Sequence, residues 1–290
     1  MLKIQNTFKN NNKTIYLVGT PIGNLDDISL RAIEVLKNSD LIYCEDKRVS
    51  INLLNKYSIK TRLKTLHKFN EQEEFDYFKT EINDYNKISI ISDAGVPCIS
   101  DPGMYFVNSI LNFYDDINIT AVNAGPAYIH TLLVSGFISY KNIFLGFLKK
   151  NTNDEIIEQI NNNSTIVCFY ESVHRIITRI NSLSLLLPLE TNIVIGREIS
   201  KINEQFIHGT LEEVKAYLNS NDFIAKGEFS IVLDLSNIKI LDNISENKIE
   251  ELVLSLKTNG LTNKDIIKEL HQKYKINKNT LSNIIYKLKK

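Results

Sequence analysis

The residues most suited to chemistry lie in the segment 88–103, where an apolar run gives way to two glycine-containing turns. Its first half is rich in isoleucine, as in a strand buried on both faces, and Ser92, Asp93 and Asp101 stand among the turn residues of its second half. Glycine lets a ligand approach the backbone closely, and open α/β sheets bind ligands beyond the carboxyl ends of their strands. The segment therefore predicts a ligand-binding loop. Either turn alone would equally be typical of an ordinary strand-to-helix connection.

Three further segments whose residues could take part in catalysis or binding follow expected strands. After the strand 14–18, two glycines four positions apart flank Pro21, but the residues match neither a Walker loop nor a dinucleotide-binding fingerprint. Glu45 to Arg48 lie between the strand 41–44 and a helix near 51–57, where a solvated charge run would explain them equally well. His67 follows a strand near 63–66. Carboxylate and imidazole groups that can transfer protons thus stand at strand ends.

The elements that must position these segments alternate from residue 14 to residue 136. Each expected strand is followed by a helix with apolar residues at helical spacing, which is typical of a parallel sheet covered on both faces. The loops that follow parallel strands meet at one edge of the sheet. After about residue 137 the strands succeed one another more closely, which predicts a mixed sheet. Polar clusters again mark strand ends there, at 170–175, 197–201 and 226–228.

The fold class predicted from this order is a two-domain α/β protein with a small helical extension. We divide the chain into a flexible tail (1–13), an N-terminal α/β domain (14–138), a second α/β domain (139–237) and a helical domain (244–290). Helices are expected near 246–256, 263–273 and 279–289. The last two resemble a helix-turn-helix, and the final twenty residues contain six lysines and no acidic residue. A helical appendage docked on the body would explain the same pattern.

Composition limits the function classes. The 290 residues have no net charge, 43% are hydrophobic and 23% are charged, which indicates a globular protein. No apolar run approaches a membrane span, and the first residues lack the apolar core of a signal peptide, so we expect a cytoplasmic protein without a membrane partner. Cys44, Cys98 and Cys168 are far apart and show no metal-ligand spacing. We therefore expect buried thiols and no metal site.

Several of these segments together resemble a known family. In chain order they are Thr20-Pro-Ile-Gly-Asn-Leu25, Glu45-Asp-Lys-Arg48, Ser92-Asp-Ala-Gly-Val-Pro-Cys-Ile-Ser-Asp-Pro-Gly103, Phe169-Tyr-Glu-Ser-Val-His-Arg175, Arg197-Glu-Ile-Ser-Lys201 and Lys226-Gly-Glu228. The chain resembles the ribosomal small-subunit RNA cytidine 2'-O-methyltransferases, called methyltransferase I, from about residue 13 to residue 235. It departs from the family pattern at Lys47, Val96, Ala124 and Lys149, and none of these departures removes an ionisable group.

The resemblance implies a tetrapyrrole-methylase-like, class III methyltransferase fold that binds S-adenosylmethionine in the cleft between its two α/β domains. It implies methyl transfer to a cytidine ribose 2'-hydroxyl in the decoding region of the small-subunit (16S) rRNA. The partner would be this rRNA, free or in the assembled small subunit, and the family is usually homodimeric. The basic C-terminal helices also look like the family's small helical domain.

The resemblance also implies roles for individual residues. The donor-binding residues would be Pro21, Ile22, Gly23, Ser92, Asp93, Ala94, Gly95, Gly125, Ala127, Tyr128, Tyr170, Gly227 and Glu228. A weakly acidic hydroxyl benefits from a base, for which the candidates are Glu45, Asp46, His67, Glu171 and Glu198. We favour Glu171 or Glu45. RNA-binding residues would be Arg48, Arg175, Arg197 and Lys201, although a structural ion pair is an equally good explanation for each arginine.

Two other functions stay open from the sequence. On the same fold, the acceptor could be a tetrapyrrole or, as in diphthine-type enzymes, a protein. From a different class, the chain could be a non-catalytic RNA-binding factor of ribosome assembly. The basic C-terminal helices favour RNA over a tetrapyrrole, and measurable affinity for S-adenosylmethionine would separate the enzymes from the assembly factor.

Overall fold

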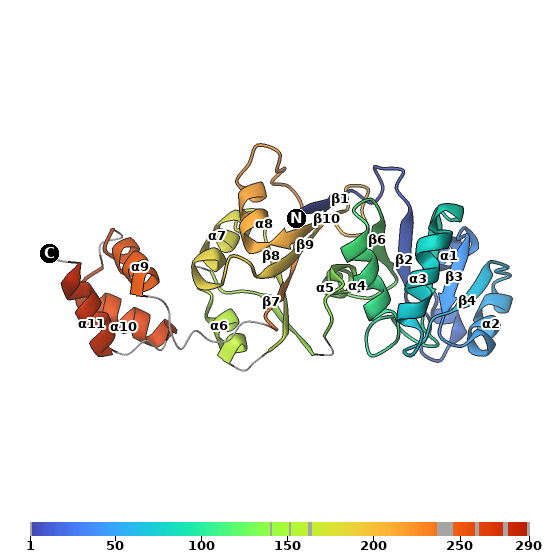
Figure 1. The fold of residues 1–290 in the computed structure, drawn as a ribbon, viewed down its shortest axis with the longest axis horizontal. Helices are drawn as coiled ribbons and strands as arrows, with labels where there is room; N and C mark the ends of the chain where they lie inside the picture. Colours follow the sequence, from blue (N-terminus) through green and yellow to red (C-terminus); the bar gives the residue numbers. More distant parts are fainter. Residues whose placement is uncertain are drawn as a thin grey trace. The chain divides into compact units, whose positions relative to one another are not determined.

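The computed structural model describes residues 2–139, 141–150, 152–161, 164–236, 246–258, 261–274 and 278–288. Contacts between Cα atoms divide the chain into two compact units. The first comprises Met1–Asn151 and Ser164–Asn237, and the second comprises Thr152–Asn163 and Ile238–Lys290. The boundary that the sequence suggests near residue 138 lies inside the first unit, where each side of it has its own sheet (Figure 1).

The first sheet is five-stranded, with the order β4-β3-β5-β2-β6, and all of its strand pairs are parallel. The strands are β2 (Thr14–Val18), β3 (Leu41–Cys44), β4 (Arg62–Thr65), β5 (Lys87–Ile91) and β6 (Asn118–Val122). β3 and β6 are buried along their whole length, as their apolar runs predict for strands covered on both faces. The parallel sheet predicted from the alternation of elements is thus confirmed.

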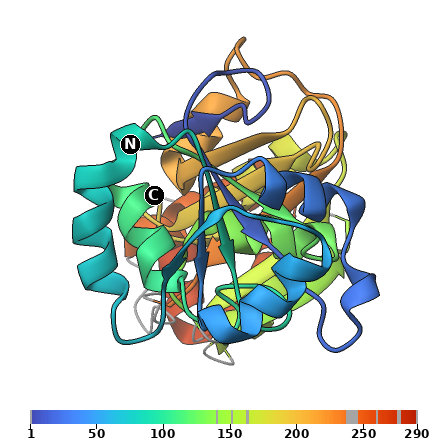
Figure 2. The ribbon, with the colours of Figure 1, turned by 90° about the vertical axis from the view of Figure 1, so that its right-hand side faces the viewer.

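Helices cover both faces of this sheet (Figure 2). They are η1 (Leu25–Asp27), α1 (Leu30–Lys37), α2 (Lys47–Lys56), α3 (Glu71–Glu81), η2 (Ile82–Asp84) and α4 (Met104–Phe113). Ala32 and Leu36 of α1 pack with Leu53 of α2 in one core cluster. Phe78 of α3 packs with Phe106 of α4 in another. The helices that follow β2 and β3 therefore cover one face of the sheet, and those that follow β4 and β5 cover the other.

The second sheet is mixed and six-stranded, with the order β1-β10-β9-β11-β8-β7. Its strands are β1 (Lys3–Gln5), β7 (Asn142–Phe147), β8 (Ile166–Glu171), β9 (Asn192–Arg197), β10 (Gln205–Thr210) and β11 (Phe229–Asp234). β7 and β8 are parallel, and the other pairs are antiparallel. The helices of this half are α5 (Ala127–Ser135), α7 (Ile176–Leu186) and α8 (Leu211–Leu218). α5 contacts β6 of the first sheet and β8, β9 and β11 of the second, so it joins the two.

The N-terminal residues differ from the flexible tail that the sequence suggests. β1 pairs antiparallel with β10, which follows it by about two hundred residues. The side chain of Gln5 accepts a hydrogen bond from Ile119 N and donates one to Ile119 O, both at 2.8 Å. An amide side chain offers the same donor and acceptor as a peptide group, so Gln5 continues the first sheet beyond its edge strand β6. Composition alone could not show this pairing, because the partners are distant in sequence.

The second unit contains α6 (Asp154–Asn161), α9 (Glu246–Thr258), α10 (Asn263–Tyr274) and α11 (Lys278–Lys287). Ile249, Val253, Ile266, Leu270 and Leu281 belong to the core that α9, α10 and α11 share. Thr262 Oγ1 accepts a hydrogen bond from Asp265 N at 3.3 Å, which caps α10. Lys275, Lys289 and Lys290 of the basic tail lie outside the described residues. Within the described ranges, no helix has the length and apolar character needed to cross a membrane.

Candidate active site

The carboxyl edge of the first sheet gathers the segments that the sequence singles out. Since the five strands are parallel, the loops that follow them lie at this one edge. These loops carry Pro21 to Gly23 after β2, Glu45 after β3, His67 after β4, Ser92 to Gly95 after β5, and Gly125 after β6. Glu171, Arg197 and Gly227 belong instead to the second sheet or its loops.

A bridge joins two of these loops at the centre of the edge. Thr20 N donates to Gly95 O at 2.7 Å, and Gly95 N donates to Thr20 O at 3.2 Å. The bridge follows the adjacent strands β2 and β5, whose next helices, α1 and α4, cover opposite faces of the sheet. Such a switch point is where open α/β sheets form a ligand-binding crevice. Gly95 has a φ of +84°, which a residue with a side chain rarely adopts.

The loops after β2 and β6 also touch. A Cβ atom on Gly19 would stand 2.3 Å from Asn123 O, so only glycine permits this approach. Asn123 Nδ2 in turn donates to Gly19 O at 3.2 Å. Next to them α5 begins at Ala127, after Pro126, whose side chain makes no capping bond. Three loops with predicted donor-binding residues are therefore fixed to one another through backbone groups.

Glu45 lies in an acidic group with Asp93 and Asp101. Burial, Asp93 and Asp101 raise the pKa of Glu45, while the nearby His67 opposes this shift. Burial also raises the pKa of Asp101, against a hydrogen bond with Ser92. Asp93 Oδ1 accepts a hydrogen bond from Asp46 N at 3.1 Å, which ties the loop after β5 to that after β3. A carboxylate with a raised pKa is a stronger base than an ordinary one, which suits Glu45 to accept a proton.

Glu171, the other favoured base, lies in a buried ion-pair cluster. Its carboxylate is fully buried and pairs with Arg175 at 2.7 Å and with Arg179 at 3.0 Å. Ser172 N adds a hydrogen bond at 2.8 Å. Two guanidinium groups thus compensate its buried charge. Through these contacts Glu171 fixes the start of α7, and the catalytic roles of Glu171 and Glu45 both stay predictions.

The predicted RNA-binding cations have different surroundings. Arg175 is engaged by Glu171 and by Leu148 O, and the buried Arg197 donates through Nε to Lys226 O at 2.7 Å. Arg48 pairs with Asp46 at 2.5 Å, yet its side chain is 90% exposed. Arg175 thus forms the ion pair that the sequence left open, Arg197 binds a backbone carbonyl, and Arg48 is open to solvent. RNA binding by these residues stays a prediction.

Glu228 and Lys201 form a second polar group, in the second half of the first unit. Lys201 Nζ lies 2.9 Å from Glu198 Oε1 and 3.1 Å from Glu228 Oε2, and its charge lowers the pKa of Glu198. Gly227 has a φ of +97°, and a Cβ there would stand 2.6 Å from Glu198. The predicted donor-binding pair Gly227–Glu228 is therefore shaped by Glu198, whose own φ is +51°.

Aromatic rings surround Tyr170. Phe144 stacks on Tyr128 with ring centroids 4.1 Å apart, and Tyr170 meets Phe144 at 4.8 Å and Phe147 at 5.5 Å. Tyr128 N donates to the Tyr170 hydroxyl at 3.3 Å. Such a group offers faces to an adenine ring or to a sulfonium cation. Sequence reasoning missed Phe144 and Phe147. The signal was present, since β7 places two large aromatic residues in a short strand.

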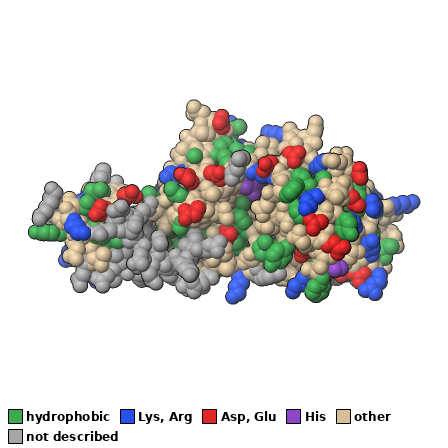
Figure 3. Space-filling model, in the orientation of Figure 1, with side chains coloured by type: hydrophobic (Ala, Val, Ile, Leu, Met, Phe, Trp, Pro, Cys, Tyr) green, Lys and Arg blue, Asp and Glu red, His purple; other side chains and the backbone are tan. Residues whose placement is uncertain are grey.

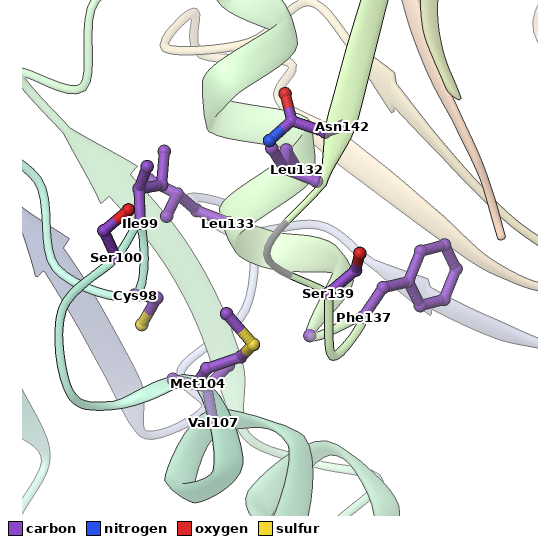
Figure 4. Close-up of a pocket in the computed structure, with 11 residues that line it drawn as sticks. Cys98, Ile99, Ser100, Met104, Val107, Leu132, Leu133, Phe137, Ser139 and Asn142 are labelled. Atoms are coloured by element: carbon purple, nitrogen blue, oxygen red, sulfur yellow. The ribbon is translucent and has the colours of Figure 1, made fainter. Parts of the chain in front are cut away.

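Two cavities lie away from these groups. One of about 40 Å³ is lined by Cys98, Ser100 and Met104 on one side and by Leu132, Phe137 and Asn142 on the other (Figure 4). It is far below the roughly 300 Å³ of a small-molecule site. Burial raises the pKa of the Cys98 thiol, which favours the neutral thiol over the nucleophilic thiolate. The other, of about 610 Å³, borders His208, Asn192 and Asn112. The three cysteines are buried and unpaired, as predicted.

Comparisons with known proteins were made by family and by individual relative. Residues 14–215 match the family described as Tetrapyrrole (Corrin/Porphyrin) Methylases. A protein of Mesomycoplasma conjunctivae named ribosomal RNA small subunit methyltransferase I is 39% identical over 244 residues, which cover 82% of this chain and 97% of the relative. The protein of the same name from Bacillus subtilis is 32% identical over 279 residues, or 93% of each chain.

Solved structures give a weaker likeness. Uroporphyrin-III C-methyl transferase from Thermus thermophilus, complexed with S-adenyl homocysteine, is 15% identical and covers 77% of this chain and 97% of its own, with a TM-score of 0.31. A diphthine synthase gives 11% identity and a TM-score of 0.31, covering 76% of this chain and 89% of its own.

Proposed function

The chain belongs to the ribosomal RNA small subunit methyltransferase I family of tetrapyrrole methylases, and we propose that it transfers a methyl group from S-adenosylmethionine to small-subunit rRNA. In finer terms, the acceptor is the ribose 2'-hydroxyl of a cytidine in the decoding region. One structural observation supports the proposed methyl transfer in addition to membership of the family. The bridge between Thr20 and Gly95 joins two loops of the family motif at the switch point of the sheet, and Asp93 in the second loop acts on the carboxyl group of Glu45.

The donor would bind mainly to the backbone. The fixed loops at Pro21–Gly23, Ser92–Gly95 and Gly125–Tyr128 present peptide groups that suit the polar ends of S-adenosylmethionine. Gly227, Glu228 and Tyr170 contribute from the second sheet. S-adenosylmethionine supplies an electrophilic methyl group, whose bond to sulfur breaks as the bond to oxygen forms. Holding the two reacting atoms in line can contribute about 7 to 11 kcal/mol to the lowering of the barrier.

Glu45 would act as the general base. It takes the proton of the 2'-hydroxyl as that oxygen bonds to the methyl carbon, so no free alkoxide forms. The burial and the neighbouring carboxylates that raise its pKa make this transfer more favourable. His67, beside Glu45, can hold the ribose or the base through its imidazole. A base of this kind accelerates the reaction by about 10² to 10⁴.

The RNA would meet exposed cations of both units. Arg48 and Lys201 are exposed in the first unit, and Lys278 and Lys287 are exposed on α11 of the second. On the face drawn in Figure 3, basic and acidic side chains are interspersed, in keeping with zero net charge. We therefore propose local phosphate contacts rather than a broad basic field. A homodimer and a cytoplasmic location remain predictions.

The decisive experiment is transfer of a labelled methyl group onto small subunits, or onto free rRNA, from a strain that lacks the modification. The proposal expects label in rRNA, on a ribose 2'-oxygen of one cytidine. Label on another nucleotide atom would contradict the finer proposal. If calorimetry shows no affinity for S-adenosylmethionine, the enzyme function fails altogether. A Glu45→Gln variant should keep donor affinity and lose about 10² to 10⁴ in kcat.

A further inference from the structure

Phe69 has the most exposed side chain among the large hydrophobic residues of the described ranges, at 92%. It lies between β4 and α3, in the loop that also carries His67. A phenyl ring left in water gives up the stabilisation that burial would contribute. Single exposed apolar residues are common, so exposure alone assigns no role to this ring. The hydrogen bonds that hold its loop and the residues near that loop do indicate a role.

The loop that carries Phe69 is a closed turn. His67 O accepts a hydrogen bond from Asn70 N at 3.0 Å, and Asn70 Oδ1 accepts one from His67 N at 2.7 Å. Asn70 Nδ2 also donates to Thr65 O at 3.0 Å, which anchors the turn to β4. Phe69 N donates to His67 Nδ1 at 3.3 Å. The backbone therefore holds the ring outward, so binding to it costs little ordering of the loop.

The turn stands beside the proposed base. Leu66 N donates to Cys44 O at 2.9 Å, so β4 and β3 remain paired up to the residues that precede His67 and Glu45. His67 acts electrostatically on Glu45, and its ring centroid lies 6.3 Å from that of Phe69. Because His67 Nδ1 accepts the hydrogen bond from Phe69 N, Nε2 is the ring nitrogen that can face a ligand. Base, imidazole and phenyl ring thus follow one another along this edge.

Exposed cations lie in the same turn and at the start of α2, which follows the neighbouring strand β3. Lys68 is exposed within the turn, and Lys47 and Arg48 are exposed in the first turn of α2, directly after Glu45 and Asp46. Proteins bind unpaired RNA by combining cations for the phosphates with aromatic faces on which bases stack. Double-stranded RNA keeps its bases inside the helix and offers no such face. The arrangement fits an unpaired nucleotide.

We infer that Phe69 is a stacking platform for an unpaired base of the acceptor RNA, next to the ribose that receives the methyl group. This inference rests on the proposed function. Phe69 takes no part in proton transfer. It positions the acceptor strand by holding one base flat against its ring, while Lys68 or Lys47 meets the adjoining phosphate. The 2'-hydroxyl is thereby presented to Glu45.

Steady-state kinetics on small subunits from a strain lacking the modification tests the role in positioning. Phe69→Leu keeps an apolar side chain but removes the aromatic face, and it should raise KM for the subunit about 5- to 150-fold. Affinity for S-adenosylmethionine should not change, and Phe69→Trp should restore the KM. The matched control is Phe113→Leu, since Phe113 is 61% exposed but ends α4, away from the carboxyl edge. It should leave the KM unchanged.

Fluorescence gives a readout independent of activity. The chain contains no tryptophan, so Phe69→Trp introduces a single indole at the platform. Titration with a short single-stranded RNA containing cytidine should quench it, because a stacked base contacts the indole. The same RNA in a duplex should not quench it, and neither RNA should quench the indole of Phe113→Trp. Anisotropy of a labelled RNA reports binding in parallel.

The outcomes separate the two proposals. Quenching by single-stranded RNA alone, with a raised KM in Phe69→Leu, supports the platform. Binding without quenching, equal quenching by the duplex, or an unchanged KM in Phe69→Leu overturns it and leaves the methyltransferase intact. Absence of methyl transfer to any RNA by the unaltered protein overturns the proposed function itself, and the platform with it.

Discussion

The charge of Asp101 acts on Glu45, the proposed base. Its carboxylate is one of the charges that raise the pKa of Glu45, so Asp101→Asn should lower that pKa. The base must be unprotonated, and activity is lost as pH falls through its pKa. The acid limb of the profile of kcat/KM against pH should therefore move to lower pH in the variant. Asp84→Asn, an exposed change distant from this edge, should leave the limb in place. An unmoved limb in Asp101→Asn would argue against Glu45 as the base.

The carboxylate of Glu171 should contribute to the stability of the fold through its ion pairs with Arg175 and Arg179. Glu171→Gln removes the charge that compensates the buried Arg179 and the half-buried Arg175. Breaking a buried pair on one side costs about 3 to 5 kcal/mol, which urea denaturation would detect. Glu228→Gln is the control. Its carboxyl is 87% exposed beside Lys201, and an exposed pair is worth at most about 1 kcal/mol. If Glu171→Gln kept full stability and lost only turnover, the result would support Glu171 as the general base.

At the scale of elements, the bridge between Thr20 and Gly95 is where one added carbon atom should have the largest effect on binding of S-adenosylmethionine. Gly95→Ala adds a Cβ that would have ordinary contact with Ile22, at 3.5 Å. The cost arises from the backbone, because alanine at positive φ is unfavourable by roughly 1 to 2 kcal/mol. We expect weaker binding of S-adenosylmethionine in calorimetry, together with a small loss of stability.

Gly23→Ala provides the comparison for stability. Gly23 lies in the same loop region, no atom stands within 4 Å of its added Cβ, and its φ is not positive. We expect its denaturation midpoint to match that of the unaltered protein. Equal destabilisation by both substitutions would show that the positive φ of Gly95 is not what matters.

Local patterns predicted most elements of the first unit. Apolar runs such as Leu41–Cys44 are long enough to mark a buried strand, and the turn residues after them mark its end. The start of α2 was less clear. Glu45 to Arg48 suggest a charged loop, but Asp46 Oδ1 accepts a hydrogen bond from Arg48 N at 2.8 Å. This cap moves the helix start to Lys47, four residues before the expected Ile51, and turns Lys47 and Arg48 into helix residues.

The candidate site could be predicted only in part, because side-chain partners depend on packing. The family motif locates the loops, and parallel strands bring those of the first sheet together. The motif gives no means of distinguishing Glu171 from Glu45. The surroundings of the two carboxylates differ because α7 brings Arg179, eight residues after Glu171, into an ion pair with Glu171. Pairing of β1 with β10 was invisible for a similar reason, since neither segment encodes its distant partner.

At the scale of the whole molecule, pH should affect stability through His208. Burial, and to a smaller extent Lys3, lowers the pKa of His208 to about 3, and Nε2 has no hydrogen-bond partner among the described residues. In the unfolded chain the ordinary pKa is about 6.5, so below that pH the unfolded state takes up a proton that the folded state refuses. Stability should thus fall as pH decreases, by about 2 kcal/mol from this group at pH 5.

Urea denaturation at pH 7 and pH 5 measures this effect. His208→Gln removes the titrating group, so the stability difference between the two pH values should shrink by about the same 2 kcal/mol. Other groups titrate in both proteins and cancel in the comparison. An identical pH dependence in the variant would mean that His208 is accessible to protons in the folded state.

The placement of β1 also has a consequence for synthesis. Residues 3–5 leave the ribosome about two hundred residues before their partner strand, which ends at Thr210. The side chain of Gln5 can bond to Ile119 once β6 has been made, but β1 remains without its partner strand until β10 has been made. The second sheet therefore closes late and through a contact of very long sequence separation, which is a slow kind of step in folding. A bulky fusion at the N-terminus would interfere with this last closure before it affected any catalytic group.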